Sequence, residues 1–172
     1  MKFIIKINFV IALIFSLTSI SNACNFVKEN MGTSITSLGD KYDLFTLAAE
    51  DDYGSDTVLV EFDTPNLCDD PLLDETFLKV YVREKKLIGI QVEALEAKNT
   101  NKIYQFAQNN FGLDDEKAKE EDWVGAIDIS FGDNIIIYGK IDEPDGIYET
   151  LELTNADYQD FLIQSDILQI TN

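Results

Sequence analysis

The sequence contains no histidine, and this absence removes a large part of ordinary enzyme chemistry. Ser-His-Asp and Cys-His catalysis in their usual forms, and zinc sites of the H-E-x-x-H type, all require that side chain. The chain also lacks the paired glycines of a dinucleotide-binding turn, the G-K-[ST] sequence of a P-loop and the G-x-S-x-G turn of serine hydrolases. We therefore expect no catalytic site of these classes.

Metal-binding motifs are missing as well. In the segment DEPDGIYETLEL, Asp145, Gly146 and Glu152 have the spacing of positions 5, 6 and 12 of an EF-hand loop. Ile141 then stands at position 1, where an EF-hand needs a carboxylate, so the motif fails. We expect neither a metal ion nor an organic cofactor.

Long hydrophobic runs are scarce, and the main one lies at the N-terminus. Two lysines precede an apolar stretch over residues 7–20, which is too short and too interrupted to span a bilayer, since a span needs about 18 or more apolar residues. The small residues Ser21 and Ala23 then precede Cys24 at the spacing of a signal-peptide cleavage site. The pattern predicts a cleaved secretory signal peptide over residues 1–23.

The chain has only two cysteines, Cys24 and Cys68. An exported protein meets an oxidising environment, where an even cysteine count favours pairing. A bacterial lipobox also ends in cysteine, but Ser21 and Asn22 match its L-[AS]-[GA]-C pattern poorly. We predict a Cys24–Cys68 disulfide, and lipidation of Cys24 is the alternative, because one sulfur cannot do both.

Positive charge is in short supply. Without the two leader lysines the chain carries 11 basic and 32 acidic residues, a net charge of −21. No lysine or arginine lies between Lys41 and Lys79, and a second acidic run covers residues 114–122. Such a surface repels phosphate backbones, so we expect no nucleic-acid partner. Plain solubility is one interpretation of this charge, and a binding face for a cationic partner or for divalent ions is the other. The candidate face comprises Asp51, Asp52, Asp56, Asp69 and Asp70.

Periodicity along residues 24–172 predicts one compact α+β domain. The expected order is a helix at 33–42, a strand at 57–63, a hairpin at 76–95, a helix at 99–112, a hairpin at 126–141, a strand at 147–154 and a last helix from 154. Hairpin connections favour a mostly antiparallel sheet of about six strands, with about three helices packed on one face. The repeated order of one helix and three strands suggests an internal duplication.

Several residues carry more specific expectations. Ile88, Ile90 and Val92 alternate with other residues and should share one face of their strand. An Asn or Thr should cap the start of the middle helix, and Gly112 should end it. The sequence TNAD from Thr154 has the form of a capping box for the last helix.

The leading hypothesis is an exported protein, periplasmic or secreted, that binds a cationic protein or envelope component and has no catalytic activity. A small carboxylate-dependent hydrolase and a lipid-anchored envelope lipoprotein are the alternatives. Trp123 follows the second acidic run and is a candidate contact residue, since tryptophan is enriched at binding hot spots. Packing in the core or at the sheet edge is the other interpretation of Trp123.

Overall fold

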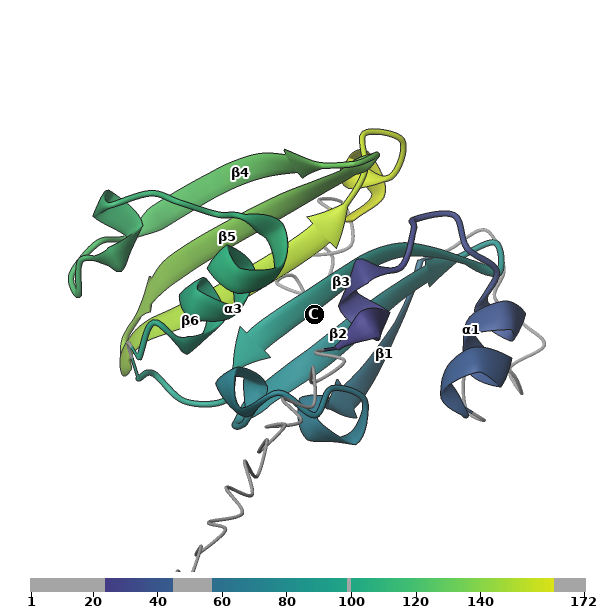
Figure 1. The fold of residues 1–172 in the computed structure, drawn as a ribbon, viewed down its shortest axis with the longest axis horizontal. Coiled ribbons are helices and arrows are strands. Elements are labelled where there is room, and N and C mark those ends of the chain that lie inside the picture. Colours follow the sequence, from purple (N-terminus) through teal and green to yellow (C-terminus); the bar gives the residue numbers. More distant parts are fainter. Residues whose placement is uncertain (1–23, 45–56, 99, 163–172) are drawn as a thin grey trace, which may run out of the picture.

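The structure, a computed structural model, describes residues 24–44, 57–98 and 100–162. Its centre is a six-stranded sheet in the order β1-β2-β3-β6-β5-β4, with every neighbouring pair antiparallel (Figure 1). The strands are β1 (Val58–Asp63), β2 (Thr76–Arg83), β3 (Lys86–Ala94), β4 (Gly125–Phe131), β5 (Asn134–Glu143) and β6 (Gly146–Thr154). The predicted α+β class is confirmed. The expected leader, residues 1–23, lies outside the described residues.

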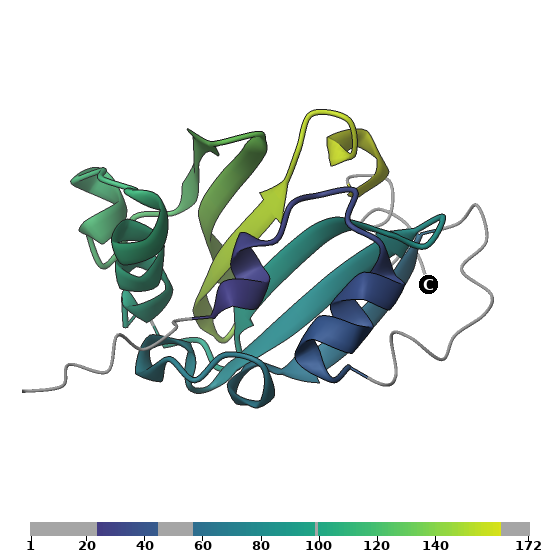
Figure 2. The ribbon, with the colours of Figure 1, turned by 45° about the vertical axis from the view of Figure 1, so that its right-hand side comes forward.

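Within the described ranges, two helices and a short turn of helix cover one face of this sheet. They are α1 (Ile35–Tyr42), α3 (Lys102–Phe111) and the 3-10 turn η1 (Asn25–Lys28). Figures 1 and 2 show α1 over the β1–β2 side and α3 over the β5–β6 side. Three further 3-10 turns, η2 (Thr64–Asn66), η3 (Pro71–Leu73) and η4 (Lys117–Lys119), lie in the connections. We call the covered side the helix face and the other side the open face.

The sheet is built from two similar halves. Strands β1 to β3 form one antiparallel meander, β4 to β6 form another, and the two join through β3 and β6 at the centre. The joint pairs Ile90 with Leu153 and Val92 with Leu151, all four fully buried on the helix face. Among the described residues, α1 precedes the first meander and α3 precedes the second, in the repeated order expected from the sequence.

A smaller apolar cluster lies on the open face at one end of the sheet. Tyr81 and Ile88 pack there against Leu162, while Leu59 and Phe161 cover them in part. The guanidinium of Arg83 lies 4.1 Å from the centre of the Phe161 ring. The chain after β6 therefore turns onto the open face, opposite α1 and α3.

The two predicted hairpins are present, and one strand differs from its expected register. A register shift beside Tyr81 and Val82 places Leu87 opposite Val82 and Gly89 opposite Tyr81, which leaves Ile88 as an extra residue. Ile90 packs in the main core, whereas Ile88 packs in the cluster on the open face. The expectation that Ile88 shares a face with Ile90 is wrong, because a β-bulge reverses the alternation between them.

Helix ends also differ in part from expectation. Gly112 ends α3 in the left-handed conformation with φ 77°, as predicted. At the start of α3, the Thr100 hydroxyl accepts from the Lys102 amide at 3.4 Å, whereas Asn101, the N-cap residue, makes no side-chain capping bond. Thr154 is the last residue of β6, and its hydroxyl donates to the Ile88 carbonyl at 3.0 Å. It therefore does not cap a helix. Asn155 instead accepts from the Asp157 amide at 3.1 Å.

The predicted Cys24–Cys68 disulfide is present and buried. It ties η1 to the connection between η2 and η3, and Phe26 and Val27 of η1 are fully buried in the main core. The bond fixes the first described residues of the chain against the helix face. Within the described part of the chain, no helix has the length and apolar character needed to cross a membrane.

Candidate functional site

The acidic residues singled out from the sequence do not form one described surface. Asp51, Asp52 and Asp56 lie outside the described residues. Asp69 is exposed next to the disulfide, and the Asp70 carboxylate accepts from the Leu72 amide at 2.9 Å. Asp70 therefore caps the short turn η3, which gives it a structural role.

Trp123 is half-buried rather than freely exposed. Its ring stacks on the ring of Tyr138, with the two planes 8° apart and the centroids 6.3 Å apart. Tyr138 in turn meets Tyr104 of α3 edge to face at 5.4 Å. Trp123 thus covers an aromatic layer that joins the loop of residues 113–124 to the sheet and to α3, as the packing interpretation anticipated.

A buried carboxylate, Glu149 of β6, lies beneath this aromatic layer. Its Oε2 accepts from the backbone amide of Tyr104 at 3.1 Å and from the Tyr138 hydroxyl at 3.3 Å. The Tyr104 amide belongs to the first turn of α3, where backbone N–H groups have no partner within the helix. A side chain from the sheet therefore caps α3 in place of Asn101.

Lys140 of β5 stands directly opposite Glu149 in the strand register, and each residue is only 1% exposed. The Lys140 ammonium donates to the Glu120 carbonyl at 2.9 Å. Removal from water lowers the pKa of Lys140, and the carboxylates of Glu149, Asp122 and Glu121 act in the opposite direction. Burial, followed by the charge of Glu149, raises the pKa of Tyr138.

This buried cluster is mostly closed to substrates. The Oε1 atom of Glu149 is buried without a partner, and Glu149 borders a cavity of only about 20 Å³. Such a cavity has room for about one water molecule. The cluster holds α3 and the loop of residues 113–124 on the sheet, and we assign it a structural role. The sequence carried a signal for it, because period two places Lys140 and Glu149 on the same face as Tyr138 and Leu151.

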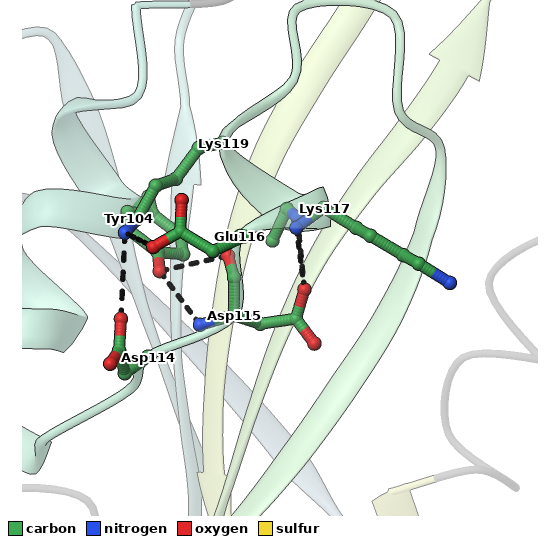
Figure 3. A network of polar contacts seen from close by, with 7 residues as sticks. Tyr104, Asp114, Asp115, Glu116, Lys117 and Lys119 are labelled. Carbon is green, nitrogen blue, oxygen red and sulfur yellow. Dashed lines mark hydrogen bonds and ion pairs between the residues drawn. The ribbon is translucent and has the colours of Figure 1, made fainter.

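Carboxylates of the second acidic run gather around Lys119 of the same run (Figure 3). Lys119 lies 2.7 Å from the Glu116 carboxylate and 3.4 Å from that of Asp114. The Tyr104 hydroxyl donates to the Asp115 carbonyl at 3.1 Å and accepts from the Asp115 amide at 3.0 Å. The middle of this loop is therefore anchored, and part of its negative charge is paired internally.

An open groove of about 360 Å³ lies on the open face of the sheet, across β3, β5 and β6. We call it the sheet-face groove. Its apolar part includes Ile141, which is 47% exposed, and the ring of Tyr148. Its carboxylates are Glu93, Glu143 and Asp145.

Two of these carboxylates already have partners. Lys79 forms an ion pair with Glu93, and the Tyr148 hydroxyl donates to Asp145 at 2.8 Å. This hydrogen bond to a carboxylate is the main reason that the pKa of Tyr148 is raised. The groove therefore combines exposed apolar surface with a net negative charge. Patterns in the sequence do not reveal this groove, since its residues come from three strands and the β5–β6 turn and none belongs to the acidic runs.

Comparison with family models, with curated proteins and with solved structures gives no match for this chain. Among the described residues, no three carboxylate or cysteine side chains come together in a way that could hold a metal ion. The sheet-face groove is accordingly the candidate site, on the strength of its own geometry and charge.

Proposed function

We propose that this chain is an exported, non-catalytic binding protein that docks a cationic segment of another protein on the open face of its sheet. The observation that carries the proposal is the sheet-face groove, where carboxylates surround exposed apolar surface. A lysine or arginine has matching chemistry, because its apolar stem packs on hydrophobic surface while its charged end meets carboxylates. After removal of residues 1–23, the net charge of −21 would steer such a partner toward the chain.

Export is part of this proposal. The N-terminal pattern of residues 1–23 and the Cys24–Cys68 disulfide both support it, since disulfides persist in oxidising compartments. The disulfide also favours a form without a lipid anchor, because a thioether-linked lipid would need the Cys24 sulfur. The intact mass of the natively exported protein tests this part. We expect a chain that begins at Cys24 and gains a pair of hydrogens on reduction, and an acylated mass would contradict it.

A direct binding measurement tests the groove. We would measure binding of a labelled peptide of alternating lysine and serine to the wild type and to the double variant Glu143→Gln/Asp145→Asn. At low ionic strength we expect the variant to bind about tenfold more weakly, because two carboxylates near the bound cation are neutralised. Added salt should narrow this difference, since it screens charges at the surface.

The matched control removes the same amount of charge from the same face. Glu61 and Asp63 are exposed on β1, an edge strand three positions from β6 in the sheet. Glu61→Gln/Asp63→Asn should lower affinity far less than the groove variant. Equal losses in the two variants would mean that net charge alone attracts the peptide, and the groove would not be the site.

A further inference from the structure

Strand β4 forms one edge of the sheet. Within the described part of the chain it pairs only with β5, from Gly125 opposite Lys140 to Phe131 opposite Asn134. The backbone N–H and C=O groups on its outer side therefore have no neighbouring strand there (Figure 1). A row of such groups is a template on which another extended chain can pair.

The β4 edge has only one of the features that usually protect an edge strand, the charged side chain of Asp128. Its sequence, GAIDISF, contains no lysine, arginine or proline, and no irregularity interrupts its pairing with β5. Natural edge strands are protected by charged side chains, proline or bulges. The opposite edge, β1, carries Glu61 and Asp63 within its six residues, and Pro65 is the second residue after the strand. The β4 edge is therefore less protected than the β1 edge against pairing with another extended chain.

The side chains of β4 give each of its faces a distinct character. Ile127 and Ile129 are half-buried on the helix face, where they pack against the main core. Asp128 is exposed and lies on the open face, since it alternates with them. Large apolar side chains mark both ends, with Val124 48% and Phe131 37% exposed. A strand added beside β4 would meet apolar surface on one face and a carboxylate on the other.

The charged residues of β4 and of the segments that flank it in the chain are all acidic. No lysine or arginine occurs between Lys119 and Lys140. Acidic residues lie before the strand at 120–122, in its middle at Asp128 and in the following turn at Asp133. A second copy of this chain would bring the same negative charges together, which disfavours pairing of β4 with itself. A basic partner segment is the complementary occupant.

We propose that β4 receives an extended segment of a cationic partner protein as an additional strand. The segment alternates apolar residues, which contact the Ile127 and Ile129 side, with lysines or arginines, which contact Asp128. This inference rests on the proposed binding role, but it uses a different surface from the sheet-face groove. The pattern follows from the pleat of the sheet, because successive side chains of an added strand point to opposite faces.

The test compares two synthetic peptides on the full mature chain. One alternates lysine and valine, and the other has the same sequence with every backbone amide N-methylated, so that it cannot donate hydrogen bonds to β4 in either strand direction. We expect the unmodified peptide to bind about tenfold or more tightly than the methylated one, because main-chain bonds to β4 are lost. Binding should also slow hydrogen exchange of the β4 amides that point away from β5. Equal affinity of the two peptides, or unchanged exchange in β4, would overturn the proposal.

Reversing the charge of Asp128 is the second test of this proposal. Asp128→Lys should weaken binding of the unmodified peptide about tenfold. Asp133→Lys, the matched control in the turn beyond the strand, should weaken it much less. Equal losses in the two variants would mean that Asp128 has no special position beside the bound strand. A dimer of the free chain that slows hydrogen exchange of the outward β4 amides would assign the edge to a second copy instead. The variant Glu143→Gln/Asp145→Asn should leave this binding largely intact, so that failure at the edge and failure at the groove remain distinguishable.

Discussion

Removing the Cys24–Cys68 disulfide gives a prediction whose size follows from the chain itself. The two cysteines are 44 positions apart, so the bond closes a loop of 45 residues. In the chain-entropy description, a loop of this size restricts the unfolded state by about 4 kcal/mol at 25 °C. We therefore expect Cys24→Ala/Cys68→Ala to lower the free energy of unfolding by about that amount. For a domain of this size each kcal/mol corresponds to about 2–4 °C, so the melting temperature should fall by about 8–16 °C.

Urea and thermal unfolding of the wild type and the double variant measure this loss. The wild type under reducing conditions is the matched control, because it lacks the cross-link but keeps both side chains. Reduced wild type and the double variant should agree closely, with both folded at room temperature since Phe26 and Val27 still anchor η1 in the core. A loss below about 1 kcal/mol would refute the reasoning from loop closure.

Three further predictions concern the packed interior. Glu149→Gln should lower the free energy of unfolding by about 1–3 kcal/mol, measured by urea unfolding, because the charged acceptor that caps α3 at the Tyr104 amide becomes neutral. The pKa of Lys140 is lowered in the folded chain, so at pH values just below 10.5 the unfolded chain binds more protons than the folded one. As the pH rises toward 10.5, the wild type should therefore gain stability relative to Lys140→Met. A parallel pH dependence of the two proteins would contradict this. Gly89→Ala should cost about 1–3 kcal/mol in thermal unfolding, because a Cβ there would lie 2.6 Å from a methyl carbon of Leu162. Leu162→Ala in the same chain should recover part of that cost, and fully additive losses would count against the contact.

The strands could be predicted from the sequence because their signal is local. Alternation in each predicted strand reports which side chains face the core, and this depends only on neighbouring residues. The prediction is wrong at Ile88, since a bulge depends on how β3 pairs with Tyr81 and Val82 of another strand. It is wrong at Thr154 for a related reason, because the partner of its hydroxyl is the Ile88 carbonyl, 66 positions away.

For the buried cluster around Glu149, alternation along the strands predicts only part of the arrangement. Alternation alone places Glu149 on the face of Leu151, and Lys140 on the face of Tyr138. It does not say that α3 docks its first turn on Glu149, or that the Glu120 carbonyl reaches Lys140. Those contacts depend on how the loop of residues 113–124 and helix α3 pack against the sheet.

By itself the sequence determined the cysteine pair, the excess of negative charge, the hairpins and the repeated order of helix and strands. Each of these is a property of composition or of residues close together in the chain. Only the tertiary structure decided that β3 and β6 meet at the centre, that β4 is left at an edge, and that Glu93, Ile141 and Tyr148 share one groove. The physical reason is that periodicity defines the faces of an element, whereas strand order and register follow from the sum of contacts between elements distant in sequence.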